Sequence, residues 1–300
     1  MRYRLPSGLE RWQLLDGYLT WQDSPTHLCE MPRPQCRGLS RRGRFLGRLG
    51  GSRLRLKVCW GFPTRTLWAV EAKGYEIRSG ADLAGADLVD ADLRSADLRN
   101  AHLAGAVMSS ADLSDACLIG ADLRHAICRR TILADADLHH ANLWNVDLTD
   151  ARAEGAVLSR CRMGNARLVA TDLRRADLGG AWVTAADLTG AMLAASTLAG
   201  SSLARTCLRE ADLTGAFAVG VDLRSGILNG ATVRAANLSG ANLRGASLVE
   251  ADLSLSDLVG ADLRGAQLEG GVLDGVRYDD TTRWPEGFVP PASGGLSDHE

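Results

Sequence analysis

Four histidines lie near carboxylates in the central part of the chain, and such pairs are a common source of acid–base catalysis near neutral pH. They are His102, His125, His139 and His140, and the last two closely follow Asp135 and Asp137. All of them belong to a regular sequence repeat, at positions that we expect to point outward or to lie at a corner. Catalysis needs groups that converge in a concave site. We therefore predict no catalytic residue and expect that the protein is not an enzyme.

The cysteines are the candidates for metal binding. Cys29, Cys36 and Cys59 share the N-terminal region with His27, so a zinc site there is a conceivable alternative. However, the seven cysteines are scattered, without a CxxC pair or any other metal-type spacing. We expect free thiols in a reducing compartment, no bound metal and no cofactor.

Regularly spaced carboxylates are the third group that could do chemistry. From Ala81 to Asp280 the chain divides into 40 consecutive five-residue units, and the second residue is Asp in 16 of them and Asn in three. Carboxylates repeated along a surface produce a negative field that attracts basic partners. The alternative is that each Asp only hydrogen-bonds the local backbone. The candidate interaction residues are Asp82, Asp87, Asp92, Asp97, Asp112, Asp122, Asp172, Asp212, Asp222, Asp252 and Asp262.

The five-residue spacing also indicates which backbone positions these side chains. The third residue of the unit is Leu in 32 of the 40 units, and the first is Ala in 28. On an α-helix successive leucines would be rotated by about 140° and would form no stripe, and in a strand they would alternate between the two faces. A chain that turns a corner after every unit keeps each leucine inside. Four sides then close a coil, and stacked coils pair as parallel strands about 4.8 Å apart.

The pattern A-(D/N)-L-x-x, continuous over 200 of the 300 residues, resembles that of the pentapeptide-repeat family. This resemblance implies an all-β fold, a right-handed quadrilateral parallel β-helix of about ten 20-residue coils, here with a small N-terminal accessory region. It also implies protein binding, since some family members are thought to mimic duplex DNA, to occupy the DNA saddle of type II topoisomerases and to protect DNA gyrase from toxins. We expect an acidic binding rod with a protein partner, either DNA gyrase or topoisomerase IV. A general interaction scaffold is the alternative.

Three regions differ in composition. Residues 1–75 are expected to form a basic accessory region that is partly disordered, residues 76–280 the β-helix, and residues 281–300 a cap, with Trp284 and Phe288 over the last coil, followed by a flexible tail. Residues 1–80 contain 15 basic against 6 acidic side chains (net +9), and residues 81–300 contain 19 against 30 (net −11). Within the basic region we predict a short helix over residues 8–19 and a strand over residues 52–60.

The Arg-rich stretch at residues 31–51 leaves nucleic-acid binding as a further alternative, although no known DNA- or RNA-binding motif accompanies it. The chain has no apolar run of about 18 residues and no apolar signal-peptide core. We therefore expect a cytoplasmic protein without membrane contact. The oligomeric state is not predicted.

Two tryptophans and an arginine interrupt the regular pattern. Trp144, Arg162 and Trp182 are predicted to share one side of the coil, because residues 142, 162 and 182 are separated by whole coils. Exposed Trp and Arg are typical anchors of protein interfaces. A partner protein and the chain's own N-terminal region are both possible occupants of this stripe.

Overall fold

The computed structural model describes the backbone of residues 12–15, 18–21, 42–49, 52–59 and 70–292, and the side chains of residues 72–292. Over these residues the regular structure consists of strands, β-bridges and turns, and the predicted all-β class is confirmed. None of the described segments contains an apolar helix of the length that spans a bilayer.

In the described residues before the repeats, six strands form three separate pairs. The first pair, β1 and β2, is antiparallel, with Trp12 opposite Trp21. The third pair, β5 and β6, is also antiparallel and leads into the first coil. The strands are β1 (Trp12–Leu15), β2 (Tyr18–Trp21), β3 (Arg42–Leu49), β4 (Ser52–Cys59), β5 (Val70–Ala72) and β6 (Tyr75–Ile77).

The helix predicted over residues 8–19 is wrong, because residues 12–15 and 18–21 form the hairpin β1–β2. Trp and Tyr favour strands, and the Asp-Gly sequence between the two strands is a preferred hairpin turn sequence. The strand predicted over residues 52–60 is confirmed as β4. The disorder expected for the Arg-rich stretch does not extend to residues 42–49, which form β3, and residues 22–41 lie outside the described residues.

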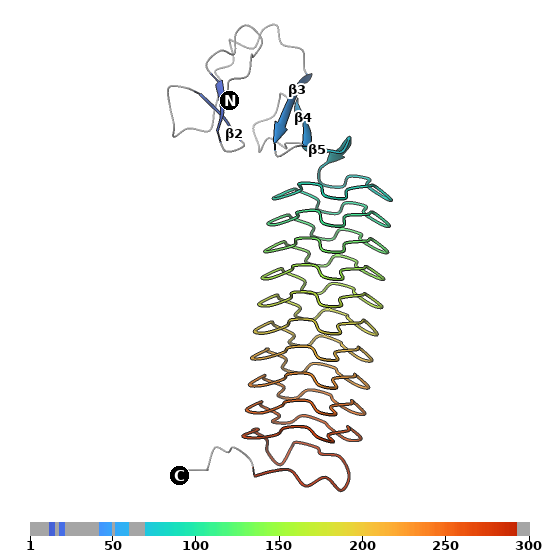
Figure 1. Ribbon diagram of the computed structural model, residues 1–300, viewed down its shortest axis with the longest axis vertical. Coiled ribbons are helices and arrows are strands. Elements are labelled where there is room, and N and C mark those ends of the chain that lie inside the picture. The colour runs from blue at the N-terminus through green and yellow to red at the C-terminus, as the bar shows by residue number, and fades with distance from the viewer. Residues whose placement is uncertain (1–11, 16–17, 22–41, 50–51, 60–69, 293–300) are drawn as a thin grey trace. The chain divides into compact units, whose positions relative to one another are not determined.

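After β6 the chain forms a stack of coils, shown in Figure 1, in which the second residue of each unit pairs with the residue 20 positions later. These bridges are all parallel and run from Asp82↔His102 to Asp257↔Arg277 without a break. Each joins neighbouring coils by backbone hydrogen bonds, as in Leu83 N to His102 O at 2.8 Å and His102 N to Ala81 O at 2.9 Å. The right-handed quadrilateral parallel β-helix is confirmed.

Each coil has four sides, so the stack has four faces. We number the faces by the units of the first coil. The second residues of these units are Asp82 (first face), Asp87 (second), Asp92 (third) and Asp97 (fourth). A face consists of the second, fourth and fifth residues of its units, because the first and third residues point inward. Leu88, Leu98 and Leu103 and the alanines at the first positions, such as Ala101, form one continuous buried core along the stack.

The corners are turns in which the fifth residue of the unit has a positive φ. This holds for 39 of the 40 units, 16 with Gly and 23 with another residue, and only Asp280 differs. Each turn is closed by a hydrogen bond from the next first-position N–H to the third-position carbonyl, as in Ala86 N to Leu83 O at 3.0 Å. This turn starts at the third residue of the unit, so the fifth residue of the unit is its third member. A positive φ at that place in a hydrogen-bonded turn is typical of type II, which explains the glycines at these corners.

The parallel ladder extends past Asp280 after a one-residue insertion. Asp262 pairs with Arg283, 21 positions later instead of 20. Thr282 then occupies the inward first position, where its buried hydroxyl donates to Leu258 O at 2.9 Å. One further side of the coil is thus formed by residues that we had assigned to the cap.

Aromatic side chains cover the C-terminal end of the core. Trp284 stacks on Phe288 with ring centres 5.4 Å apart, and Tyr278 meets Trp284 edge-on at 5.3 Å. All three are partly buried and pack against the core, as does Tyr75 of β6. A solenoid needs such covers because its terminal coils would otherwise expose their apolar interior.

Candidate protein-interaction site

Every second-position Asp and Asn accepts a hydrogen bond from the backbone N–H two residues later. All 16 Asp and three Asn do so, at distances such as 3.1 Å from Val89 N to Asp87 and 2.9 Å from Thr214 N to Asp212. Because the fourth residue lies in the turn, its N–H has no partner on the neighbouring coil, and the side chain supplies the acceptor. The local role that we considered as an alternative is therefore present at each of these residues.

Arginine pairs with six of the eleven candidate carboxylates. Where the unit reads Asp-Leu-Arg, the Arg guanidinium donates through both Nε and Nη2 to the Asp carboxylate, and the Nη2 to Oδ2 distance is 2.6–2.8 Å. This paired geometry is the strong form of an Arg–carboxylate contact. The pairs are Asp92–Arg94, Asp97–Arg99, Asp122–Arg124, Asp172–Arg174, Asp222–Arg224 and Asp262–Arg264.

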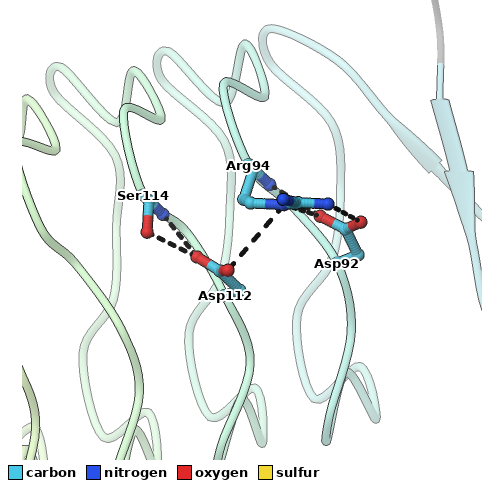
Figure 2. Close-up of polar contacts among 4 residues, drawn as sticks. All are labelled: Asp92, Arg94, Asp112 and Ser114. Atoms are coloured by element: carbon cyan, nitrogen blue, oxygen red, sulfur yellow. Dashed lines mark hydrogen bonds and ion pairs between the residues drawn. The ribbon is translucent and has the colours of Figure 1, made fainter. Parts of the chain in front are cut away.

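These pairs change the electrostatics of the rod in two ways. The hydrogen bonds from Arg hold the pKa of each of the six Asp carboxyls below its usual value, and that of Asp262 falls to about 2. The carboxylates therefore stay ionised at any physiological pH, but each carries a compensating positive charge beside it. Arg94 also contacts Asp112 on the next coil (Figure 2), with 3.8 Å between Arg94 Nε and Asp112 Oδ2. One guanidinium therefore contacts carboxylates on two coils.

The five other candidates have different surroundings. The pKa of Asp87 is lowered, mainly by a backbone hydrogen bond from Val89 and next by Lys73, whose Nζ lies 3.4 Å from the Asp87 carboxylate. Asp112 accepts from Ser114 Oγ at 2.6 Å (Figure 2). Asp82, Asp212 and Asp252 form no ion pair with any residue that the structure describes.

The structure distributes the eleven candidates over all four faces instead of gathering them at one site. Four lie on the first face, one on the second, five on the third and one on the fourth, and among them only Asp92 and Asp112 are direct ladder partners. The regular Asp positions therefore do not by themselves identify a binding face.

The turn residues decide the charge of each face. The first face has 4 acidic and 6 basic side chains (net +2), the second 8 and 4 (net −4), the third 9 and 5 (net −4), and the fourth 6 and 3 (net −3). The rod is thus acidic on three faces and basic on one. This asymmetry was missed when only the second position of the unit was considered.

The edge between the second and third faces carries four carboxylates and one basic residue, Arg130, at its fifth positions (net −3), and the sequence analysis did not single it out. Asp90, Asp150, Glu210 and Glu250 are exposed fifth-position residues, and they form no ion pair with the described residues. Counting acidic residues at the fifth position of every fourth unit would have identified this acidic edge.

Trp144, Arg162 and Trp182 lie on the first face. Arg162 is bridged to Asn142 on one side and to Trp182 on the other, and its guanidinium carbon is 5.7 Å from the centre of the Trp182 ring. Trp182 is 62 % exposed and Trp144 is 43 % exposed. Trp144 leans over Gly164 of the next coil, where a side chain would collide with the indole.

Histidine and cysteine show no convergent arrangement in residues 72–292. His139 Nδ1 lies 2.8 Å from Ser159 Oγ, and its ring meets that of His140 edge-on at 4.2 Å. Burial raises the pKa of the Cys128 thiol to about 12, so this thiol stays protonated. No group of three potential metal ligands lies together in the described part of the chain. His27, Cys29 and Cys36, and most of the Arg-rich stretch proposed for nucleic-acid binding, lie outside it.

The repeat region matches the family model "Pentapeptide repeats" in eight copies, over residues 79–115, 116–152, 154–190, 191–230 and 236–275. No curated protein sequence matches the chain. Among solved structures, the pentapeptide-repeat protein HetL of the cyanobacterium Nostoc sp. PCC 7120, involved in heterocyst differentiation regulation, is 30% identical, with coverage of 67% of this chain and 91% of HetL and a TM-score of 0.45.

Two further solved structures match the chain at lower similarity. Rfr23 of the cyanobacterium Cyanothece 51142 is 27% identical, over 44% of this chain and 90% of Rfr23, with a TM-score of 0.22. QnrB1, a plasmid-mediated fluoroquinolone resistance protein, is 18% identical, over 59% of this chain and 85% of QnrB1, with a TM-score of 0.35.

Proposed function

The chain belongs to the pentapeptide-repeat family, and we propose that it is a non-catalytic rod that binds a basic surface of another protein through its second and third faces. The observation that carries this proposal is the unpaired acidic edge between these two faces, formed by Asp90, Asp150, Glu210 and Glu250. These carboxylates project from rigid turns at a fixed register. A partner therefore meets charges whose backbone positions are fixed by the turns, and only their exposed side chains are ordered on binding.

The strength of this field can be compared with that of DNA. The three acidic faces together carry 23 acidic and 12 basic side chains (net −11). Over ten coils, or about 48 Å, this is one net charge per about 4 Å, against one per about 1.7 Å in duplex DNA. The rod is a weaker polyanion than DNA, so we expect binding that is sensitive to salt and that depends on the unpaired edge more than on total charge.

Within this class we propose a type II topoisomerase, DNA gyrase or topoisomerase IV, as the partner, with the rod taking the place of duplex DNA on its basic saddle in the cytoplasm. An elongated stack with net negative charge on three of its four faces is compatible with a groove that holds a duplex. Occupation of the saddle would also limit the access of toxins that act on the enzyme–DNA complex.

Titration of DNA gyrase supercoiling, with and without a fluoroquinolone, tests the proposal. The test variant carries Asp90→Asn, Asp150→Asn, Glu210→Gln and Glu250→Gln, which remove the edge charge and keep turn residues of similar shape. We expect it to require at least about tenfold more protein for the same inhibition or protection, the effect of losing about 1.4 kcal/mol of binding free energy.

A matched control separates the edge from total charge. Ala84→Lys, Ala104→Lys, Thr184→Lys and Ala204→Lys change the net charge of the protein by the same amount on the first face, and we expect them to leave the titration unchanged. Absence of both inhibition and protection at micromolar wild-type protein would exclude gyrase as the partner. Equal loss in both variants would exclude the acidic edge as the binding surface.

A further inference from the structure

The first face contains the longest stretch of the rod without an outward carboxylate. In four consecutive coils, residues 142–145, 162–165, 182–185 and 202–205, the outward positions carry no Asp or Glu but two Trp, two Arg and three Asn. On the other faces such a stretch spans at most three coils. A rod that otherwise distributes carboxylates over its whole surface therefore leaves one region open to negatively charged groups.

Basic side chains in this region lack acidic partners. Arg162 and Arg205 lie on the first face and Arg160 on the turn that precedes it, and none of them forms an ion pair with a described residue. The stem of Arg160 lies over Gly180, two residues before Trp182. By contrast, Arg124, Arg224 and Arg264 on the same face are paired with Asp of their own units.

The two indoles give this region an apolar contact area. Trp182 exposes 62 % of its surface while Arg162 lies over its ring, and the Trp144 ring lies over Gly164 on the neighbouring coil. Gly164 is buried beneath it, so the backbone approaches the indole closely. Large aromatic surfaces beside unpaired Arg are the side chains that contribute most to protein interfaces. We call Trp144, Arg160, Arg162, Trp182 and Arg205 the Trp–Arg patch.

The charges of the patch distinguish between two kinds of negatively charged partner. A nucleic acid that binds through its backbone is held by about 6–10 phosphate contacts, whereas the patch offers three unpaired Arg, and the second and fourth faces on either side are acidic. An acidic peptide segment needs fewer cations, and it can place apolar side chains on the indoles between its carboxylates. The number of unpaired cations and the exposed aromatic area together fit a peptide.

We propose that the Trp–Arg patch is a second binding site, which takes an extended acidic segment of a partner protein, with its carboxylates on Arg160, Arg162 and Arg205 and its apolar side chains on Trp144 and Trp182. This site lies on the only face with a net positive charge and does not depend on the function proposed for the acidic edge. A partner with one basic and one acidic surface could contact both.

Fluorescence anisotropy with the full chain tests this site. The probe is a fluorescein-labelled peptide of alternating Glu and Val, compared with a Lys–Val peptide and a labelled oligothymidylate. We expect the wild type to bind the Glu–Val peptide in preference to the other two. Trp182→Ala should raise the Kd at least about tenfold, as truncation of a central interface residue does, and Arg162→Ala should raise it by a smaller factor.

Two variants serve as matched controls. Phe217→Ala removes an exposed aromatic side chain from the fourth face, and Arg167→Ala removes an exposed Arg that lies on the second face five residues after Arg162. Neither should change the Kd, and the variant without edge charges should bind the peptide as the wild type does. The proposal is overturned if the wild type does not bind the Glu–Val peptide, if the controls weaken binding as much as Trp182→Ala, or if oligothymidylate binds more tightly.

Discussion

At the scale of single residues, the first position of the unit is restricted to small side chains, because it lies inside the corner of the coil. Ala occupies 28 of these 40 positions. Where a hydroxyl replaces Ala, it needs an acceptor in the core, and Ser201 finds one in Leu198 O at 2.7 Å. Ser196 and Ser256 are fully buried, and their Oγ atoms have no hydrogen-bond partner. Each of these two hydroxyls lost its hydration on folding without compensation.

We therefore expect Ser196→Ala and Ser256→Ala each to stabilise the protein by about 1 kcal/mol, because the substitution removes an unsatisfied buried hydroxyl and introduces the usual residue of this position. Urea unfolding followed by circular dichroism measures the change. Ser201→Ala is the matched control and should be destabilising, since it removes a hydroxyl that is bonded. A loss of stability in all three variants would contradict this account.

At the scale of the structural element, the repeated turn determines the coil. It requires a left-handed backbone at the fifth position, which costs an L-residue about 1–2 kcal/mol. Gly avoids this cost, yet 23 turns have another residue there, among them Ala185 (φ 56°) and Leu255 (φ 60°). The strain persists because the ladder and the buried third-position side chain hold the same conformation, and in units such as that of Leu255 an Asp, here Asp252, also accepts the turn N–H.

Gly190→Ala should therefore destabilise the protein by about 1 kcal/mol, from the backbone alone. Gly190 has a φ of +64°, and an added Cβ would meet no atom within 4 Å. The reciprocal change, Ala185→Gly, should be neutral or stabilising. Thermal unfolding of the two variants measures both effects. If Gly190→Ala is neutral while Ala185→Gly is destabilising, turn strain is not the controlling term.

At the scale of the whole molecule, the stack behaves as a one-dimensional array. The ladder hydrogen bonds join only neighbouring coils, so each coil is stabilised by the coils before and after it. Coils in the middle have two such neighbours, and the last coil has one. The aromatic cover formed by Tyr278, Trp284 and Phe288 replaces the missing neighbour at the C-terminal end.

Trp284→Ala should consequently loosen the C-terminal coils first. We expect a loss of about 2 kcal/mol, less than the 3–5 kcal/mol for a fully buried aromatic side chain, because Trp284 is only partly buried. Hydrogen exchange measured by mass spectrometry should show faster exchange of the Val272 and Arg283 amides, whereas the Asp122 amide keeps its protection. Phe217→Ala, which truncates an exposed aromatic side chain, is the control and should change neither. Uniform loss of protection along the stack would contradict a one-dimensional array.

The sequence predicted the fold of the repeats because each unit encodes the same local conformation. Leu at the third position and Ala at the first indicate the inward side, and their spacing determines the coil without knowledge of distant contacts. Residues 8–19 lack such repetition, and the helix predicted there was wrong since two short strands could pair instead.

The candidate interaction residues were harder to interpret from the sequence. The sequence by itself determined that Asp recurs on the outside of the coils and that Trp144, Arg162 and Trp182 share a face. Only the tertiary structure decided which charges remain available, because this depends on contacts across turns and between coils. It showed the Arg pairs that neutralise Asp92 and its counterparts, the unpaired edge from Asp90 to Glu250, and the carboxylate-free Trp–Arg patch. The period specifies the backbone, whereas the free surface charge is a property of the stacked coils.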